Sequence, residues 1–136
     1  IKIKRLAGKL DRVLVDAPCS GLGTLRRNPD LKWRQTPDSV AELNAKQASI
    51  LSAAAGLVKK GGRLVYATCS LLEAENDAIV SAYLTAHPEF VSLSAADVLG
   101  KQGVEIGAAM SADYRLRLLP HRHGTDGFFA AVLQRT

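Results

Sequence analysis

Cysteine is scarce in this sequence: two occur in 136 residues, Cys19 and Cys69, and they lie far apart along the chain. Two remote thiols provide neither a disulfide framework nor a set of zinc ligands, which need more, and more closely spaced, cysteines or histidines. The sequence also lacks a run of about 18 apolar residues, an N-terminal signal pattern, a repeat and a low-complexity linker. We therefore expect a cytoplasmic protein with no membrane span and no bound metal.

The charge balance is basic, with 18 Lys and Arg residues against 13 Asp and Glu and a formal net charge of +5. Such a balance makes a polyanionic partner plausible without selecting one. Hydrophobic residues make up 47% of the chain, which is enough to build a core and argues against disorder. The length suits one globular domain over residues 1–136.

Strand and helix patterns alternate along the chain. Val13, Leu14 and Val15 form a continuous apolar run, which is typical of a strand buried on both faces of a parallel sheet. Thr36 is a good N-cap and Pro37 suits the first helical position, and we expect Gly61 and Gly62 to end the helix that starts there. The expected strands are 11–18, 63–69, 89–95, 114–120 and 127–135; the expected helices are 36–58 and 73–86; residues 97–113 are expected to form a long loop.

This alternation predicts an α/β fold with parallel strands. The ligand crevice of such a sheet lies outside the carboxyl ends of its strands. Both cysteines lie at the carboxyl end of an expected strand: Cys19 directly follows the first, in "DAPCS", and Cys69 ends the second, in "ATCS". Because neighbouring strands are about 5 Å apart, Cys19 and Cys69 can share one site if their strands are adjacent.

A thiolate is a strong nucleophile that can add to a polarised carbon and act by covalent catalysis. The simpler interpretation is structural for each residue alone. Free cysteine commonly packs as a small hydrophobe, Asp16 suits a turn after a strand, and Arg26 and Arg27 suit a solvated face. Two cysteines at matching strand ends favour the chemical interpretation.

Three segments resemble motifs of a known family: "DAPCSGLGTLRRNPDLKW", "GGRLVYATCSLLEAEN" and "HRHGTDGFFAAVLQR". They resemble the fourth, sixth and last motifs of the S-adenosylmethionine-dependent RNA cytosine-5 methyltransferases of the NOL1/NOP2/Sun family. The match runs from about residue 11 to residue 136. The stretch "RRNPDLKW" further resembles the bacterial branch that modifies a cytosine of 16S ribosomal RNA.

The resemblance implies a role for each site residue. Cys69 is implied to add to carbon 6 of cytosine, which activates carbon 5 for methylation, while Cys19 assists breakdown of the covalent adduct. Asp16 is implied to lie between the methionine end of S-adenosyl-L-methionine and the target base, where Pro18 shapes the wall. The expected RNA-binding residues are Arg26, Arg27, Lys32 and Arg34.

The resemblance also places the chain within a fold. Methyltransferases of this class order their strands 3-2-1-4-5-7-6, and this sequence begins close to the fourth strand. We therefore expect the C-terminal half of a Rossmann-like class I sheet, which is a partial catalytic domain without the glycine-rich cofactor loop. The isolated chain is expected to be inactive, to bind the cofactor poorly and to self-associate through the exposed edge of its first strand.

Two alternatives stay open. The first is an RNA-binding or regulatory fragment without catalysis. It would use the basic loop, which leads from Cys19 into Arg26, Arg27, Lys32 and Arg34, and a second cluster of cationic and histidine side chains: Arg115, Arg117, His121, Arg122 and His123. The second is a DNA cytosine-5 methyltransferase. That class would use the thiol of the Pro-Cys motif and would not need Cys69.

Overall fold

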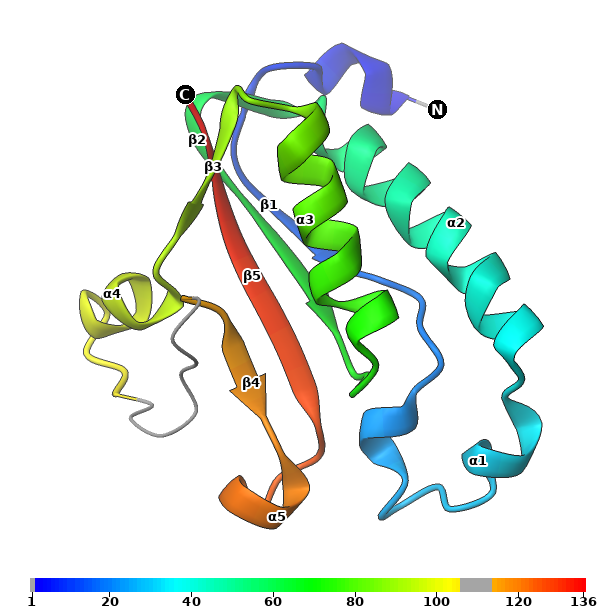
Figure 1. Cartoon of the computed structure of the whole chain (residues 1–136). Coiled ribbons are helices and arrows are strands. Elements are labelled where there is room, and N and C mark those ends of the chain that lie inside the picture. The colour runs from blue at the N-terminus through cyan, green and yellow to red at the C-terminus, as the bar shows by residue number, and fades with distance from the viewer. Residues whose placement is uncertain (1, 106–113) are drawn as a thin grey trace.

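The computed structural model describes residues 2–105 and 114–136. Its strands form one sheet in the order β1-β2-β5-β3, and the short β4 pairs with β5 (Figure 1). The strands are β1 (Leu10–Asp16), β2 (Val58–Thr68), β3 (Phe90–Leu93), β4 (Leu116–Leu118) and β5 (Phe128–Arg135). This order corresponds to the 4-5-7-6 end of the expected methyltransferase sheet.

The sheet is mixed rather than wholly parallel, which corrects the expectation. β1 and β2 are parallel, whereas β5 runs antiparallel to β2, β3 and β4. The reason lies in the connections, because parallel neighbours need a long crossover while antiparallel neighbours can be joined by a short one. A helix joins β1 to β2, but only a short segment joins β4 to β5. The α/β fold class is confirmed.

Two long helices, α2 (Pro37–Ala55) and α3 (Asp77–Ala86), cover one face of the sheet (Figure 1). Between them and the sheet lies an apolar core that includes the fully buried side chains of Leu51, Leu64 and Phe129. The remaining helices are short: η1 (Lys2–Leu6), η2 (Leu22–Thr24), α1 (Leu31–Arg34), η3 (Glu73–Glu75), α4 (Ala95–Gly100) and α5 (Pro120–His123).

Helix α2 begins where the sequence predicts and ends earlier. The Thr36 hydroxyl accepts a hydrogen bond from the Ser39 amide at 3.1 Å, and the Ser39 hydroxyl accepts one from the Thr36 amide at 2.9 Å. The helix ends before Gly56, and Gly61 and Gly62 lie within β2. A β-carbon on Gly62 would stand 2.9 Å from the Leu10 carbonyl oxygen, so this glycine permits the close approach of β1 where the strand register shifts.

Strand β1 is buried on one face only, which corrects the expectation that this strand is buried on both faces of the sheet. In the sheet that the described residues form, β1 is an edge strand. Val15 belongs to the core beneath α2, whereas Leu14 is 69% exposed and points to the opposite face. There it borders a hollow together with Val65 and Val132.

The expected loop over 97–113 begins as a helix instead. The Ser94 hydroxyl accepts a hydrogen bond from the Asp97 amide and caps α4, which covers part of the sheet face opposite α2 and α3. The remainder of that loop, 106–113, lies outside the described residues. None of the helices in the described part of the chain is long and apolar enough to cross a membrane.

Candidate active site

The two cysteines meet at the carboxyl ends of β1 and β2. Asp16 is paired with Ala67 in the parallel register, and both strands finish within a residue of this pair. The chain then turns away from the sheet, and Cys19 Sγ lies 3.4 Å from Cys69 Sγ. Both thiols are free and half-buried. The strand ends therefore bring remote residues into one site, as their spacing predicts.

The Cys19 thiol is held in its protonated form. Burial raises its pKa to about 12, and the hydrogen bond with the Cys69 sulfur also raises it, while a hydrogen bond from the Gly21 backbone acts in the opposite direction. The thiolate is the nucleophilic form of cysteine, so Cys19 is a poor nucleophile near neutral pH. The two sulfur atoms share a hydrogen bond in which either thiol can be the donor.

A buried carboxyl group joins the two cysteine loops. Glu75 is 0% exposed and accepts hydrogen bonds from the Ser20 amide at 2.7 Å and the Ser20 hydroxyl at 2.6 Å. The oxygen that accepts from the Ser20 hydroxyl, Oε2, also accepts a hydrogen bond from the Ser70 hydroxyl. The side-chain amide of Gln47, on α2, donates to Glu75 at 3.2 Å and to the Pro18 carbonyl at 2.9 Å.

The loop after Cys69 is fixed by further buried hydrogen bonds. The Asn76 side chain donates to the Ser70 carbonyl at 2.9 Å and accepts from the Thr68 hydroxyl at 2.5 Å. The Tyr66 hydroxyl donates to the Glu75 carbonyl at 2.7 Å. These contacts fold the chain back onto β2 directly after the cysteine, so Cys69 sits on a rigid turn.

Backbone contacts at Gly23 join three segments around the thiols. The Gly23 amide donates to the Cys69 carbonyl at 2.8 Å, and the Gly23 carbonyl accepts from the Gly127 amide at 2.7 Å. A β-carbon on Gly23 would stand 2.3 Å from the Gly127 carbonyl oxygen and 2.6 Å from that of Cys69. Only glycine allows this approach, so the basic loop is bound to the loop of Cys69 and to the start of β5.

The side chains of Asp16 and Pro18 are exposed beside Cys19. Asp16 ends β1, and no donor among the described residues hydrogen-bonds its carboxylate. An exposed carboxylate at the carboxyl end of a parallel strand is placed to bind a ligand. The Pro18 carbonyl, in contrast, is engaged by Gln47.

The predicted RNA-binding residues divide into two pairs, of which Arg26 and Arg27 form the first. Arg26 Nε lies 2.6 Å from Asp126 Oδ1, and Arg27 also contacts this carboxylate. These contacts hold the pKa of the buried Asp126 carboxyl below its usual value. The two arginines therefore fasten the basic loop to the segment before β5, while their side chains remain 46% and 65% exposed.

Lys32 and Arg34 form the second pair, on either side of Trp33. Arg34 pairs with Asp30 at 2.8 Å, and Lys32 Nζ lies 4.9 Å from the centre of the Trp33 ring. The Trp33 side chain is 80% exposed. Sequence reasoning did not select this residue, although the position of the chain's single tryptophan between two cations was a usable signal.

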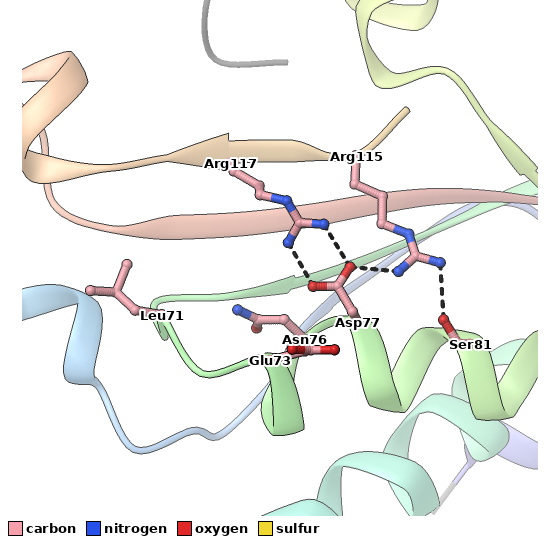
Figure 2. A pocket seen from close by; sticks show the side chains of 7 residues that line it. All are labelled: Leu71, Glu73, Asn76, Asp77, Ser81, Arg115 and Arg117. Carbon is pink, nitrogen blue, oxygen red and sulfur yellow. Dashed lines mark hydrogen bonds and ion pairs between the residues drawn. The ribbon is translucent and has the colours of Figure 1, made fainter. Parts of the chain in front are cut away.

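A polar hollow lies between η3, α3 and β4, and it is bordered by Leu71 of the loop that follows Cys69 (Figure 2). Arg117 donates to both carboxylate oxygens of Asp77 at 2.6 and 2.7 Å, and Arg115 donates to Asp77 at 2.6 Å and to Ser81 at 3.4 Å. Burial raises the pKa of Asp77, but the hydrogen bonds from the arginines outweigh it and the pKa lies below its usual value. Both arginines, which one alternative assigned to RNA, thus join β4 to α3.

Comparison with known proteins identifies the family. The family model described as 16S rRNA methyltransferase RsmB/F matches residues 2–134. The chain is 47% identical over 128 residues to the probable ribosomal RNA small subunit methyltransferase B of Bacillus subtilis, and 42% identical over 127 residues to the ribosomal RNA small subunit methyltransferase B of Serratia proteamaculans. These matches cover 93% and 92% of the chain but only 28% and 26% of the relatives, so the chain spans about a quarter of their length.

Solved structures agree with this assignment. The crystal structure of PH0851 superposes with a TM-score of 0.84 at 38% identity, covering 95% of this chain and 27% of that one. The structure of NSun6 from Pyrococcus horikoshii with SFG superposes with a TM-score of 0.75 at 29% identity, covering 98% and 32%. The strand order, the paired thiols and these matches lead to one conclusion: the chain belongs to the RsmB/F family of 16S rRNA methyltransferases.

Proposed function

We propose that this chain, residues 1–136, is the part of a catalytic domain that binds and activates the target base. The domain methylates carbon 5 of a cytosine in 16S ribosomal RNA. The observation that carries the proposal is the 3.4 Å separation of Cys19 Sγ and Cys69 Sγ at the ends of adjacent parallel strands. The exposed carboxylate of Asp16 ends the first of these strands. Because the chain spans about a quarter of its relatives, the activity is that of a longer protein.

The two thiols have different tasks in the proposed reaction. Carbon 5 of cytosine is a weak nucleophile, and addition of the Cys69 sulfur to carbon 6 moves an electron pair toward carbon 5. S-adenosyl-L-methionine, when bound, supplies the methyl group as an electrophile. A water molecule acting as a base then takes the carbon 5 proton, and the electron pair of that bond expels the Cys69 sulfur as a thiolate, which restores the aromatic ring. Cys19 hydrogen-bonds the Cys69 sulfur and assists breakdown of the adduct as that sulfur departs.

Asp16 and Pro18 form the part of this chain that faces the cofactor in the proposal. The Asp16 carboxylate is exposed and accepts no hydrogen bond from the described residues, so it is available to the cytosine ring during addition of the thiolate. Pro18 provides a rigid apolar wall beside it. In the proposal, Asp16 and Pro18 would contact S-adenosyl-L-methionine, and the thiols would face the target base.

The RNA contacts of the proposal come from the basic loop and α1. Arg26, Arg27, Lys32 and Arg34 supply positive charge toward phosphates, and Asp126 and Asp30 offset part of it. Trp33 adds an exposed aromatic face beside Lys32, which suits stacking on an unpaired base. A target base must leave its stack to reach the thiols, and contacts of this kind offset that cost.

The proposal is tested in the full-length protein with 16S ribosomal RNA and methyl-labelled S-adenosyl-L-methionine. Cys69→Ala should abolish methyl transfer, whereas Cys19→Ala should leave protein covalently bound to RNA on a denaturing gel. The opposite pattern would exchange the roles of the two thiols. If a variant lacking both cysteines kept the biological function, RNA binding without catalysis, which the exposed Trp33 and its cations also favour, would be the better account.

Two further proposals concern the chain itself. A cytoplasmic location suits a protein that acts on ribosomal RNA with two thiols that must stay reduced. Self-association of the isolated 136-residue chain would occur through the exposed edge of β1, where Leu14 is uncovered.

A further inference from the structure

We propose that Glu75 is a positioning residue that holds Cys19 and Cys69 at their reacting separation. The proposal rests on the proposed function, in which these two thiols carry the chemistry. Glu75 does not touch either sulfur. It binds Ser20 and Ser70, which are the residues that directly follow the two cysteines.

The sheet does not position the thiols by itself. The last hydrogen bond of the parallel strand ladder is donated by the Ala17 amide to the Ala67 carbonyl at 2.9 Å. Beyond that point each chain leaves the sheet, and both cysteines lie in this region. Glu75 bonds both departing loops one residue beyond each sulfur, where the Ser20 and Ser70 hydroxyls also lie 3.4 Å from each other. Farther along the first loop, the Gly23 amide adds a hydrogen bond to the Cys69 carbonyl.

The carboxyl group is fully engaged in a buried setting. Glu75 Oε1 accepts from the Ser20 amide and from Gln47, and Oε2 accepts from the hydroxyls of Ser20 and Ser70. A carboxylate offers about four acceptor sites on its two oxygens, so these donors satisfy it. A buried carboxylate without such donors would be strongly unfavourable. The buried position of Glu75 therefore depends on Ser20, Ser70 and Gln47, and the position of the two serines depends on Glu75.

The anchoring of Glu75 is independent of both cysteines. Its backbone carbonyl accepts from the Tyr66 hydroxyl at 2.7 Å, and its backbone amide donates to the Leu72 carbonyl at 3.1 Å. Gln47 approaches from α2 and holds the side chain from the other side. Because Tyr66 and Gln47 are themselves fully buried, Glu75 is a fixed point against which both loops are set.

Three substitutions separate positioning from folding. Glu75→Gln keeps the shape: its oxygen can accept from the Ser20 amide, and its NH₂ can donate to the serine hydroxyls, which can also accept. Glu75→Asp keeps the charge but withdraws the carboxylate by one methylene, so it cannot reach both loops. The matched control is Glu73→Gln, because Glu73 lies in the same short helix with an exposed side chain.

The first measurement follows the separation of the thiols without RNA or cofactor. A diazene dicarboxamide oxidises the full-length protein: the two thiols lose two protons and two electrons, one S–S bond forms, and the reagent is reduced to its hydrazine. Mass spectrometry of the peptide that links Cys19 to Cys69 gives the rate. Glu75→Asp should form this disulfide at least about tenfold more slowly than the parent, because small displacements of reacting groups reduce rates steeply. Glu75→Gln and Glu73→Gln should stay within about threefold.

The second measurement is the split between kcat and KM for RNA methylation, with circular dichroism to confirm that each variant is folded. Glu75→Asp should lower kcat and leave KM for RNA within about twofold, because Glu75 contacts the loops of the thiols rather than the RNA. Disulfide formation at the parental rate in folded Glu75→Asp would overturn the proposal. Since this rate needs no substrate, it decides the role of Glu75 even if Cys69 is shown not to be the nucleophile.

Discussion

Trp33 is the residue whose surroundings most favour a direct RNA contact. A large aromatic side chain that is 80% exposed, with Lys32 over its ring and Arg34 next to it, offers a stacking face and positive charge at one place. The Arg26 and Arg27 side chains, by comparison, are partly committed to Asp126. We therefore expect stacking at Trp33 to contribute strongly to RNA affinity.

Replacing Trp33 by Ala should weaken binding of a 16S RNA fragment by about 1–3 kcal/mol, which is the usual contribution of one stacked base. Trp33→Phe should keep part of that affinity, because an aromatic face remains. Fluorescence of the chain's single tryptophan should fall as RNA is added. Equal affinities for the parent and Trp33→Ala would show that Trp33 does not stack on the RNA.

Single buried polar residues were the hardest to identify from sequence. Glu73 and Glu75 are two positions apart in one short segment, yet Glu73 is exposed and Glu75 is fully buried. The difference arises from Ser20 and Gln47, which are distant in sequence and meet Glu75 only in the folded chain. The cysteines could be predicted because each lies close after the end of a strand, and the adjacency of the two strands brings them together.

At the scale of elements, the loops that leave β1 and β2 form the site because they interlock with the segment before β5. Gly23 is at the centre of this contact, with one backbone hydrogen bond to Cys69 and another to Gly127. Any side chain there must displace one of two carbonyl groups. The position of the Cys69 loop thus depends on a residue with no reactive group.

Gly23→Ala should lower the free energy of unfolding by about 2 kcal/mol or more, because it breaks backbone contacts in a packed region. The matched control is Gly100→Ala in α4, where a β-carbon would meet open space. This control should be neutral or stabilising by up to about 1 kcal/mol, since alanine favours a helix. Urea unfolding of both variants provides the measurement, and equal stabilities would show that the loops can separate without cost.

Local signals predicted where elements begin better than where they end. Thr36 and Pro37 determine the start of α2 through contacts within a few residues of each other. Its end could not be predicted in the same way, because Gly61 and Gly62 resemble a helix stop but lie within β2. There Gly62 permits the approach of β1, and Gly61 has a left-handed backbone conformation. The antiparallel β5 is likewise a consequence of which strands pair, and an apolar pattern alone does not carry this information.

At the scale of the whole molecule, the 136-residue chain presents an uncovered sheet edge. The outer side of β1 has no partner among the described residues, and Leu14 is exposed next to it. Unpaired backbone groups on an apolar edge strand template pairing with a second chain. A two-fold arrangement that joins two β1 edges would satisfy these groups in both copies.

The isolated chain should therefore sediment as a dimer or larger species. Leu14→Lys should shift it toward the monomer, because a charged side chain opposes pairing at that edge. S-adenosyl-L-methionine should not bind this chain at micromolar concentration, since Asp16 and Pro18 alone cannot offset the several kcal/mol lost on immobilising a ligand. A monomer that binds the cofactor at micromolar concentration would contradict both expectations.

The central claim is that Cys69, assisted by Cys19, forms the covalent bond with the target base. The most direct measurement uses the full-length Cys19→Ala protein, incubated with 16S ribosomal RNA and S-adenosyl-L-methionine, denatured, and digested with protease and nuclease. Mass spectrometry should then find a methylated cytidine on the peptide that contains Cys69. A nucleotide attached to any other residue, or methylated RNA released without an adduct in this variant, would contradict the account.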